Sequence, residues 1–375
     1  MDCDGPLEMT KLKIDALVLG AGPAGSAFAL NLAPFQKVVI LEAAPPAAMR
    51  IGESLPAAAG KLLADMGLYE AFLQQGHQPA HLNISHWGSD LATEQDAMRN
   101  LDGHGWYLDR HRFDCWLQDV AQERGAALLR QSKLLSFAPA KSNPDHWDVV
   151  ITVQGKTVQV ETRMLIDASG RKSLLTRQLG IARKAMDKLV CSWLVGRDTD
   201  NTAGSSHIRA EAGGWWYSSS LPGQGRIVAF YTDADLPAAA ACNHQQGLLQ
   251  RLRQNTQLSA CLDEYGFVPG QQHGYCAAHT AVLEQFAGSN WLAIGDAALS
   301  FDPLSSQGIF NALYTGLAAA EAVSHYDGDA QAGYIAELNS IQAAYLHHLQ
   351  VWYQQEQRWA DQPFWQRRNA TFIAA

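Results

Sequence analysis

Residues 12–25 join an apolar stretch directly to a glycine-rich turn, Leu-Lys-Ile-Asp-Ala-Leu-Val-Leu-Gly-Ala-Gly-Pro-Ala-Gly. This order predicts a β-strand, a tight turn and then a helix over residues 24–32. Gly20 permits the turn, Gly22 lets the backbone approach a pyrophosphate, and Gly25 lets the helix pack closely on the strand. The pattern is therefore typical of a dinucleotide-binding fold.

The residues that follow the turn support the same interpretation. Pro23 suits the first position of a helix, and the amides from Ala24 onward are expected to point at phosphates, where the helix dipole favours negative charge. A second strand is predicted over residues 37–41, and it ends at Glu42. A carboxylate about 20 residues beyond the motif accepts hydrogen bonds from ribose hydroxyls. Glu42 and the adjacent Ala43 are therefore expected at the ribose.

Length and composition limit the other possibilities. A chain of 375 residues is too long for one ordinary core, which predicts two domains. The net charge is −9 and no stretch concentrates Lys and Arg, so nucleic acid is not an expected partner. The six cysteines show no CxxC spacing, which predicts reduced thiols rather than a zinc ribbon or a disulfide framework. No run of about 18 apolar residues occurs, so we expect no membrane span and a cytoplasmic location.

Strand and helix signals change character along the chain and predict a discontinuous domain arrangement. The nucleotide-binding domain is expected over residues 11–78, 106–185 and 286–340, the substrate domain over residues 79–105 and 186–285, and a helical segment over residues 341–375. In the first domain, helices are expected over residues 57–74, 110–124 and 308–326, and strands over residues 128–137, 148–152, 158–166 and 291–294. In the second, strands are expected over residues 189–195, 214–219 and 227–232, with a short helix over residues 245–253.

Two more glycine-bearing turns follow predicted strands. The segment Asp167–Gly170 follows one strand, and the segment Gly295–Gly308, which carries Asp296, follows another. Because ligands collect beyond the carboxyl ends of parallel strands, all three turns are expected to surround one long ligand. Taken alone, Gly295 and Asp296 are equally consistent with an ordinary turn that the aspartate caps.

With these three turns the chain resembles the FAD-dependent group A aromatic hydroxylases and the flavin-dependent tryptophan halogenases, whose signatures are GxGxxG, a DG-type turn and GDAxxxxPxxxxG. The resemblance implies an α/β fold, with a Rossmann-like FAD-binding domain of the glutathione-reductase type, a mixed β-sheet substrate domain and a helical C-terminal tail. It also implies that FAD is the cofactor. The residues that it assigns to FAD are Gly20, Gly22, Pro23, Ala24, Gly25, Glu42 and Ala43 at the adenosine end, Asp296 at the ribityl chain, Asp167, Gly170, Gly295 and Pro303 in the two later turns, and Ser306, Gln307, Gly308 and Ile309 beside the isoalloxazine ring.

Two further segments match this family. Residues 51–56, Ile-Gly-Glu-Ser-Leu-Pro, resemble a Gly-Glu-Ser segment that lies against the flavin in the halogenase-like branch, which assigns Glu53 and Ser54 to the cofactor site. The alternative is a plain helix start capped by Ser54. Residues 107–114 resemble a family helix start that places Arg110 near the phosphates or the ribityl chain of FAD.

The sequence departs from the halogenase pattern at positions that bear on the reaction. Flavin halogenases carry a WxWxIP signature and a lysine that handles hypohalous acid. Residues 214–222 are Gly-Trp-Trp-Tyr-Ser-Ser-Ser-Leu-Pro instead, and the candidate segment over residues 81–87 has no lysine. The resemblance therefore implies hydroxylation of an electron-rich aromatic ring through a flavin C4a-hydroperoxide, formed from reduced FAD and O2. The absence of a second Rossmann fingerprint fits enzymes that use NAD(P)H, or another reductant, only transiently.

The C-terminal sequence narrows the resemblance to one branch of these flavoproteins. A helix over residues 337–359 places Ile341, Tyr345, Leu349 and Trp352 on one face, which we expect to pack on the substrate domain, with a partner-binding surface as the alternative. This tail and the Gly-Glu-Ser-Leu-Pro loop look like a branch of LodB-like and GoxB-like flavoproteins, which are partners of quinoprotein oxidases. That branch is implicated in hydroxylating a precursor tryptophan during cysteine tryptophylquinone biogenesis. The resemblance thus implies an oxidase precursor as substrate and partner.

Two other functions stay open from the sequence. One is a small-molecule enzyme, either an aromatic hydroxylase or a tryptophan halogenase, and the other is a flavoprotein that assists assembly without turnover. Glu53, Gln307 and Tyr217 are the candidates for catalysis above the flavin ring. No metal site is expected, because no carboxylate or thiolate completes a ligand set around the histidines at 77 and 81 or at 347 and 348.

Overall fold

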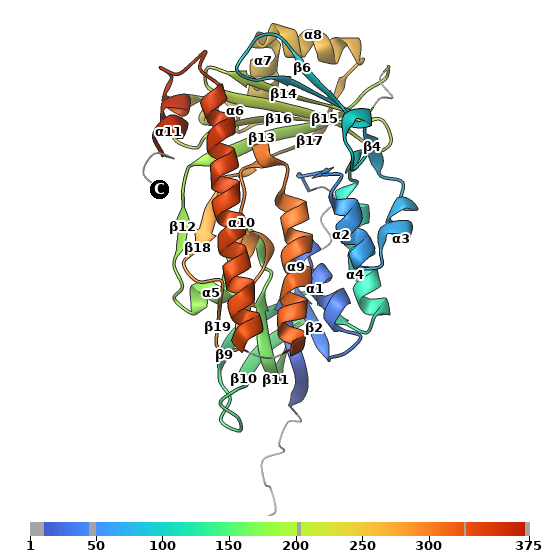
Figure 1. Cartoon of the computed structure of the whole chain (residues 1–375), viewed down its shortest axis with the longest axis vertical. Helices are drawn as coiled ribbons and strands as arrows, with labels where there is room; N and C mark the ends of the chain where they lie inside the picture. The colour runs from blue at the N-terminus through green and yellow to red at the C-terminus, as the bar shows by residue number, and fades with distance from the viewer. Residues whose placement is uncertain (1–10, 45–49, 201–203, 326–327, 372–375) are drawn as a thin grey trace, which may run out of the picture.

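The computed structural model describes residues 11–44, 50–200, 204–325 and 328–371. Two large β-sheets lie at opposite ends of the molecule, an eight-stranded sheet in the lower part of Figure 1 and a seven-stranded sheet at the top. The long helix α10 (Gly328–Gln355) runs along the molecule from one to the other. The tail of the chain therefore connects the two sheets.

The eight-stranded sheet is built around β1 (Leu12–Leu19), in the order β19-β20-β11-β1-β2-β8. The strands parallel to their neighbours are β2 (Val38–Glu42), β8 (Ala127–Arg130), β11 (Lys156–Asp167) and β20 (Trp291–Ala293). The antiparallel additions are β9 (Ser132–Pro139), β10 (Trp147–Val153) and β19 (Ala287–Gly288). Because β1, β2, β11 and β20 run in the same direction, their carboxyl ends meet at one edge of the sheet.

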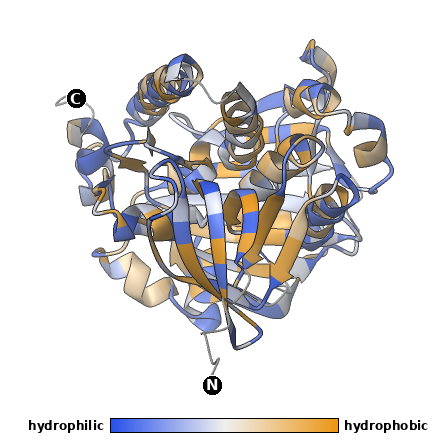
Figure 2. Cartoon of the chain, turned by 90° about the horizontal axis from the view of Figure 1, so that it is seen from below, coloured by the Kyte–Doolittle hydropathy of each residue, from blue (hydrophilic) through white to orange (hydrophobic). Residues whose placement is uncertain are grey.

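Three helices pack together beside this sheet, with α1 (Pro23–Leu32) against both α4 (Arg110–Glu123) and α9 (Gly308–His325). A Cβ atom on Gly316 of α9 would lie 2.5 Å from the Ala24 carbonyl oxygen of α1, so the glycine allows a close approach. Nearly every residue of α1 is buried, as expected for a helix with no polar face. Figure 2 shows the largely hydrophobic central strands of the sheet, with helices above them.

The seven-stranded sheet has the order β17-β13-β16-β15-β14-β5-β6. Its strands are β5 (Leu82–His86), β6 (Thr93–Asp96), β13 (Leu189–Arg197), β14 (Ser205–Glu211), β15 (Gly214–Leu221), β16 (Gly225–Asp233) and β17 (Val268–Ala277). Helices α6 (Pro237–Cys242), α7 (Gln245–Gln254) and α8 (Thr256–Glu264) cover one face, where Trp216 and Phe230 join their apolar side chains. Because side chains alternate along a strand, Trp215 and Tyr231 point to the opposite face.

Shorter elements complete the chain. One three-stranded sheet contains β3 (Ser54–Leu55), β4 (Gln78–Ala80) and β7 (Gly105–Tyr107), and another contains β12 (Arg183–Ala185), β18 (Ala281–Leu283) and β21 (Leu299–Ser300). The remaining α-helices are α2 (Ala59–Asp65), α3 (Tyr69–Leu73), α5 (Leu174–Gln178) and α11 (Pro363–Thr371). Within the described ranges, no helix combines the length and the apolar character that a membrane span requires.

The predicted fold class is confirmed, but several local expectations are wrong. The helix expected over residues 57–74 is divided into α2 and α3, because Gly67 between them adopts a left-handed conformation with φ of 68°. The strand expected over residues 128–137 is likewise divided into β8 and β9 at Gln131, whose φ is 53°. Helices α6 and α8, on either side of the predicted helix α7, were not expected.

The tail helix is longer than predicted and presents a slightly different face. Tyr345 and Leu349 are buried as expected, and Ile341 is partly buried. The prediction for Trp352 is wrong, because its side chain is 46% exposed whereas that of Tyr353 is 1% exposed. Residues on one face of a helix recur every three or four positions. After Leu349 the next buried residue is Tyr353, four positions later, and not Trp352, three positions later.

Candidate active site

A cavity of about 1030 Å³ lies between the carboxyl edge of the eight-stranded sheet and the face of the seven-stranded sheet opposite α6, α7 and α8. This volume is at the upper end of the range of about 300–1,000 Å³ that is typical of cofactor and small-molecule sites. We call one part the nucleotide end, lined by Gly20, Gly22, Pro23, Ala24, Glu42, Ala43, Gly170 and Asp296 among others. We call the other part the aromatic end, lined by Cys191, Trp215, Tyr217, Ile227, Tyr231 and Cys276.

Backbone packing shapes the turn after β1. Gly20 has a φ of 117°, and a Cβ atom there would lie 2.5 Å from the Ala168 carbonyl oxygen. A Cβ atom on Gly25 would lie 2.0 Å from the Gly20 carbonyl oxygen, so Gly25 supports the turn without lining the cavity. A Cβ atom on Gly22 meets nothing within 4 Å, and no side chain caps the helix there. The first-turn amides of α1 are thus left for a ligand, which fits a pyrophosphate.

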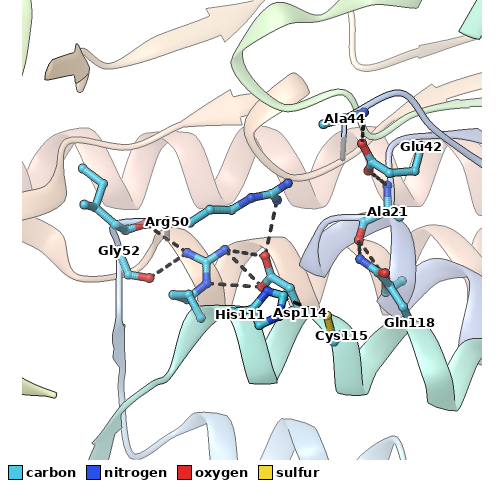
Figure 3. Close-up of polar contacts among 12 residues, drawn as sticks. Ala21, Glu42, Ala44, Arg50, Gly52, His111, Asp114, Cys115 and Gln118 are labelled. Atoms are coloured by element: carbon cyan, nitrogen blue, oxygen red, sulfur yellow. Dashed lines mark hydrogen bonds and ion pairs between the residues drawn. The ribbon is translucent and has the colours of Figure 1, made fainter. Parts of the chain in front are cut away.

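Glu42 is held at the carboxyl end of β2 by two backbone amides. Its Oε2 accepts a hydrogen bond from the Ala21 amide at 2.9 Å, and its Oε1 accepts one from the Ala44 amide at 2.8 Å (Figure 3). Gln118 of α4 donates from Nε2 to the Ala21 carbonyl oxygen at 2.8 Å and thereby ties α4 to the turn. Gln118 was not predicted from the sequence, because only the folded position of α4 brings it to residue 21.

Arg110, which lines the cavity, also anchors the loop that carries Glu53. Its Nη1 donates to the carbonyl oxygens of Ile51 at 3.1 Å and Gly52 at 2.7 Å, and its guanidinium pairs with Asp114 at 3.2 Å. The Arg110 guanidinium reaches both Asp114 oxygens, and the Arg50 guanidinium also donates to Oδ2, at 3.3 Å (Figure 3). Asp114 therefore balances two cations beside the nucleotide end.

Glu53 lies at the junction of the two ends, with its side chain buried. The residue is 2% exposed, and its Oε1 accepts a hydrogen bond from the Ser219 hydroxyl at 2.8 Å. Its Oε2 accepts one from the Gly52 amide at 3.1 Å. Ser54, which also lines the cavity, begins β3 and pairs with Tyr107 of β7 rather than capping a helix. The short strand therefore fixes the position of this loop.

The two later turns contribute in different ways. Asp167 is fully buried and accepts hydrogen bonds from the amides of Ser169, Leu175 and Thr176, so it organises its own turn instead of lining the cavity. Asp296 does line the cavity, and its Oδ2 lies 3.5 Å from Nε of Arg171.

Gly295 supports the third turn from behind the cavity wall. Its φ is 56°, a Cβ atom there would lie 2.7 Å from the Ala24 Cβ, and its amide donates to the Thr315 hydroxyl at 2.9 Å. Gly295 thus sets the position of Asp296 without facing the cavity itself.

The segment before α9 and the first turn of that helix supply the cavity floor, with Pro303, Ser306, Gly308 and Ile309 among the lining residues. Gln307, expected beside the ring and in catalysis, is half-buried and does not line the cavity. Asp302 does line the cavity, although it is not among the site residues predicted from the sequence; its position just before Pro303 was the available signal.

Asp302 is 1% exposed and is held by the tail helix. Its Oδ2 accepts a hydrogen bond from the Tyr353 hydroxyl, and its amide donates to the Tyr345 hydroxyl, both at 2.7 Å. Burial, reinforced by the nearby Asp187 carboxylate, raises the pKa of Asp302 from 3.8 to about 6. Asp302 also lines a second cavity of about 240 Å³, so it separates the two spaces.

The aromatic end is built from β15 and β16. Trp215 stacks on Tyr231 with ring centroids 3.9 Å apart and planes at 12°. The Tyr217 hydroxyl and the Trp215 indole nitrogen are buried without a hydrogen-bond partner in the described structure. Burial and the Glu53 carboxylate raise the pKa of the Tyr217 phenol, so it stays protonated. These two unpaired donors fit a site that receives a polar ligand.

No lysine lies at the aromatic end among the described lining residues. Lys133 and Lys172 line the cavity, but they belong to β9 and to the turn after β11, at the nucleotide end. β5, which contains most of the segment where a halogenase lysine was sought, does not line the cavity. The lysines that line the cavity therefore lie in the region expected to hold phosphates.

Of the histidines considered for a metal site, His77 is buried and serves packing, whereas His81, His347 and His348 are exposed. His77 lies against Phe72 and Phe113, and its Nδ1 accepts a hydrogen bond from the Asp109 amide at 3.2 Å. Burial lowers the pKa of His77 to about 4, so its ring is neutral. Across the described ranges, no group of three or more His, Cys, Asp or Glu side chains is arranged to hold a metal ion.

Comparison with known proteins agrees with this geometry. Residues 89–374 match the model of the tryptophan halogenase family. The chain belongs to this family. The chain is also 32% identical over 368 residues to the putative FAD-dependent oxidoreductase LodB of Marinomonas mediterranea, an alignment that covers 95% of this chain and 97% of LodB. The predicted resemblance to halogenase-like and LodB-like flavoproteins is confirmed.

Two solved structures show the same fold at low identity. The chondrochloren halogenase CndH, a myxobacterial FAD-dependent halogenase, matches with a TM-score of 0.85 at 20% identity, over 97% of this chain and 88% of CndH. The peptidyl tryptophan dihydroxylase QhpG, essential for tryptophylquinone cofactor biogenesis, matches with a TM-score of 0.73 at 23% identity, over 95% of this chain and 78% of QhpG. This tryptophan halogenase family member is thus a flavin-dependent, halogenase-like oxidoreductase that uses FAD.

Proposed function

We propose that this chain is an FAD-dependent monooxygenase that hydroxylates a tryptophan side chain of a quinoprotein oxidase precursor. The observation that carries the proposal is the continuity of one cavity from three glycine-bearing turns to an aromatic wall without lysine. The turns suit a dinucleotide, and the wall suits a flat aromatic ring. The absence of an ammonium group at the aromatic end favours transfer of oxygen to the ring over transfer of an oxidised halide.

The nucleotide end offers a matching group for each part of FAD. The amides that follow Gly22 would hold the pyrophosphate, and Glu42 would accept hydrogen bonds from the ribose hydroxyls. Asp296 would bind the ribityl chain. The amides at the start of α9, near Gly308 and Ile309, would face the pyrimidine edge of the ring, where they favour negative charge. Reduced FAD supplies the activation of dioxygen, with NAD(P)H or another reductant as the transient electron donor.

At the aromatic end, the chain's own residues would orient the substrate and accept its proton. The stacked pair Trp215 and Tyr231 provides an apolar surface for an indole ring. The Tyr217 hydroxyl would donate a hydrogen bond to an oxygen in the cavity, which would remove the cost of about 1–3 kcal/mol of leaving it unpaired. Glu53, held by Ser219, would accept the proton that the ring releases when it regains aromaticity.

The choice of a protein-bound tryptophan rests on the relatives. LodB aligns with nearly the whole chain, and LodB-like flavoproteins are the branch that the tail and the Gly-Glu-Ser-Leu-Pro loop resemble. QhpG, named as a peptidyl tryptophan dihydroxylase, shares the fold. Both relations favour a peptidyl substrate over a free metabolite.

Co-expression tests the proposal directly. An oxidase precursor is produced alone, with this chain, or with its Glu53→Gln variant, and the tryptophan peptide is weighed by mass spectrometry. We expect the peptide to gain oxygen only with the unsubstituted chain. A precursor that binds the chain but gains no oxygen would overturn hydroxylation and indicate an assembly role.

Halogenation is the second candidate, because the matching family model is that of tryptophan halogenases. Incubation of the reduced, FAD-loaded protein with free tryptophan, bromide and air distinguishes it. We expect no bromotryptophan, whereas efficient bromination would replace the proposed reaction with halogenation.

A further inference from the structure

Two cysteines from different strands face each other at the aromatic end. Cys191 of β13 and Cys276 of β17 are direct partners in the antiparallel register of these strands. Such partners project their side chains to the same face, with Cα atoms about 4.5–5.5 Å apart. Disulfides span Cα separations of about 4.4–6.8 Å, so the register places these cysteines within the range that a disulfide bridges.

The surroundings distinguish the two thiols from the others in the described part of the chain. Both line the cavity, with Cys191 fully buried and Cys276 half-buried, whereas Cys115, Cys242 and Cys261 lie elsewhere. A hydrogen bond from the Cys191 thiol, aided by the charge of Arg171, lowers the pKa of Cys276. Burial raises the pKa of Cys191 well above its ordinary value. Cys276 is therefore the better nucleophile, with Cys191 beside it.

We propose that Cys191 and Cys276 form a redox-active dithiol, which hydrogen peroxide converts into a disulfide that joins β13 to β17 inside the cavity. The Cys276 thiolate attacks one peroxide oxygen, the O–O bond breaks, and the departing hydroxide takes a proton to become water. Cys276 is then a sulfenic acid, and the Cys191 sulfur attacks it to form the S–S bond and release a second water. The two thiols lose two electrons and two protons, and one peroxide becomes two waters.

The site is suited to protect the cavity. Peroxide forms when dioxygen accepts two electrons without oxygenating a substrate, and this local source of oxidant rests on the proposed function. The adjacent aromatic rings of Trp215 and Tyr231 are oxidisable, and Cys276 would intercept peroxide beside them. Reduction by a dithiol would restore both thiols, because a disulfide, unlike a sulfinic acid, is reversible.

Peptide mapping of the FAD-loaded protein tests the proposal. The protein is treated with one equivalent of hydrogen peroxide, free thiols are alkylated, and chymotryptic peptides are weighed with and without dithiothreitol. Chymotrypsin cleaves after Tyr265 and Phe267, which separates Cys261 from Cys276. We expect a linked peptide pair containing Cys191 and Cys276 that dithiothreitol releases. Full alkylation of both thiols after peroxide, or a link to another cysteine, would overturn the proposal.

Three variants sharpen the result. Cys191→Ser leaves Cys276 without its partner, so dimedone is expected to label Cys276 as a sulfenic acid. Cys276→Ser is expected to abolish oxidation of Cys191, whereas Cys115→Ser, a control outside the cavity, is expected to retain the full yield of linked peptide. Because peroxide is added directly, the outcome does not depend on hydroxylation, and a missing disulfide is distinguishable from failure of the proposed function.

Discussion

The two ends of the cavity achieve their shapes by different means. At the nucleotide end, backbone atoms touch where glycine leaves no Cβ, as at Gly25, whose Cβ would lie 2.0 Å from a carbonyl oxygen. At the aromatic end, side chains from β15 and β16 form the surface, and Trp215 stacks on Tyr231. The expected cofactor site is thus encoded in local backbone geometry, whereas the proposed substrate site depends on strand register.

Charge divides the cavity in the same way. The cationic lining residues Arg50, Arg110, Lys133, Arg171 and Lys172 come from the eight-stranded sheet, the start of α4 and the adjoining loops. The aromatic end carries thiols and aromatic rings, with the buried Glu53 carboxylate at the junction. Phosphates are favoured by the first environment and a neutral indole by the second. This division favours one orientation of the proposed flavin dinucleotide and its proposed substrate in the cavity.

The largest expected effect tests the backbone-built end. Gly25→Ala is expected to lower the free energy of unfolding by about 3 kcal/mol or more and to abolish FAD binding, because the new methyl group clashes with a rigid carbonyl. Gly22→Ala is the matched control, since its methyl group meets nothing within 4 Å. It should change apoprotein stability by about 1 kcal/mol at most and still weaken FAD binding. Thermal unfolding measures the stability of the two variants, and flavin absorbance measures their FAD content. Equal stability of the two variants would contradict this account.

The next effect separates binding from chemistry. Glu53→Gln is expected to slow aromatic hydroxylation by about 10²–10⁴-fold with FAD content unchanged, because the amide cannot accept a proton. Glu42→Gln is expected to do the reverse, weakening FAD binding while preserving the rate of the loaded protein. Flavin titration and product mass spectrometry distinguish them. Loss of FAD in Glu53→Gln would place that carboxylate with the cofactor instead.

A pH effect concerns Asp302, which lies in the wall shared by the two cavities. The folded protein holds its proton up to a pKa of about 6, whereas the unfolded chain releases it near 3.8. The folded state binds more protons between these values, so this group's contribution to stability is present below about pH 4 and is lost as pH rises through about 6.

Asp302→Asn removes that titration. Between pH 4 and pH 6, the free energy of unfolding is expected to fall less in the variant than in the parent. The difference between the two falls is on the order of 2–3 kcal/mol. Urea unfolding across this range measures the difference. Parallel pH profiles for the two proteins would show that Asp302 does not titrate in this way.

The smallest effect concerns the unpaired Tyr217 hydroxyl. Tyr217→Phe is expected to leave apoprotein stability unchanged or raise it by about 1 kcal/mol, because no hydrogen bond is lost and a buried polar group is removed. Substrate affinity should fall if the hydroxyl meets a ligand oxygen. A variant that is less stable than the parent would show that the hydroxyl has a partner within the protein.

The differences between the two ends of the cavity explain which site residues could be predicted from the sequence. Gly20, Gly22 and Glu42 follow spacing rules that arise from one strand, turn and helix, so their positions were predictable. Asp167 matched the motif, but in the structure its carboxylate binds three amides of its own turn. Motif spacing identifies the segment, whereas the direction of each side chain depends on local hydrogen bonds. The roles of these residues at FAD, and the proposed domain boundaries, stay predictions.

The aromatic end was harder to predict, because it depends on strand pairing across distant segments. Tyr217 was selected, but nothing local indicated that Tyr231 would stack on Trp215 or that Cys191 would face Cys276. Gln307 was chosen by its place in a motif, yet it does not line the cavity. Trp352 was placed on the buried face of the tail helix, where the structure has Tyr353 instead.

The central claim is that one cavity accommodates both FAD and an aromatic ring. A crystal structure of the FAD complex tests it most directly. We expect the pyrophosphate at the amides of α1, the ribose at Glu42, and the flavin ring between the start of α9 and the wall formed by Trp215 and Tyr217. A flavin bound elsewhere, or a ring directed away from that wall, would contradict the account.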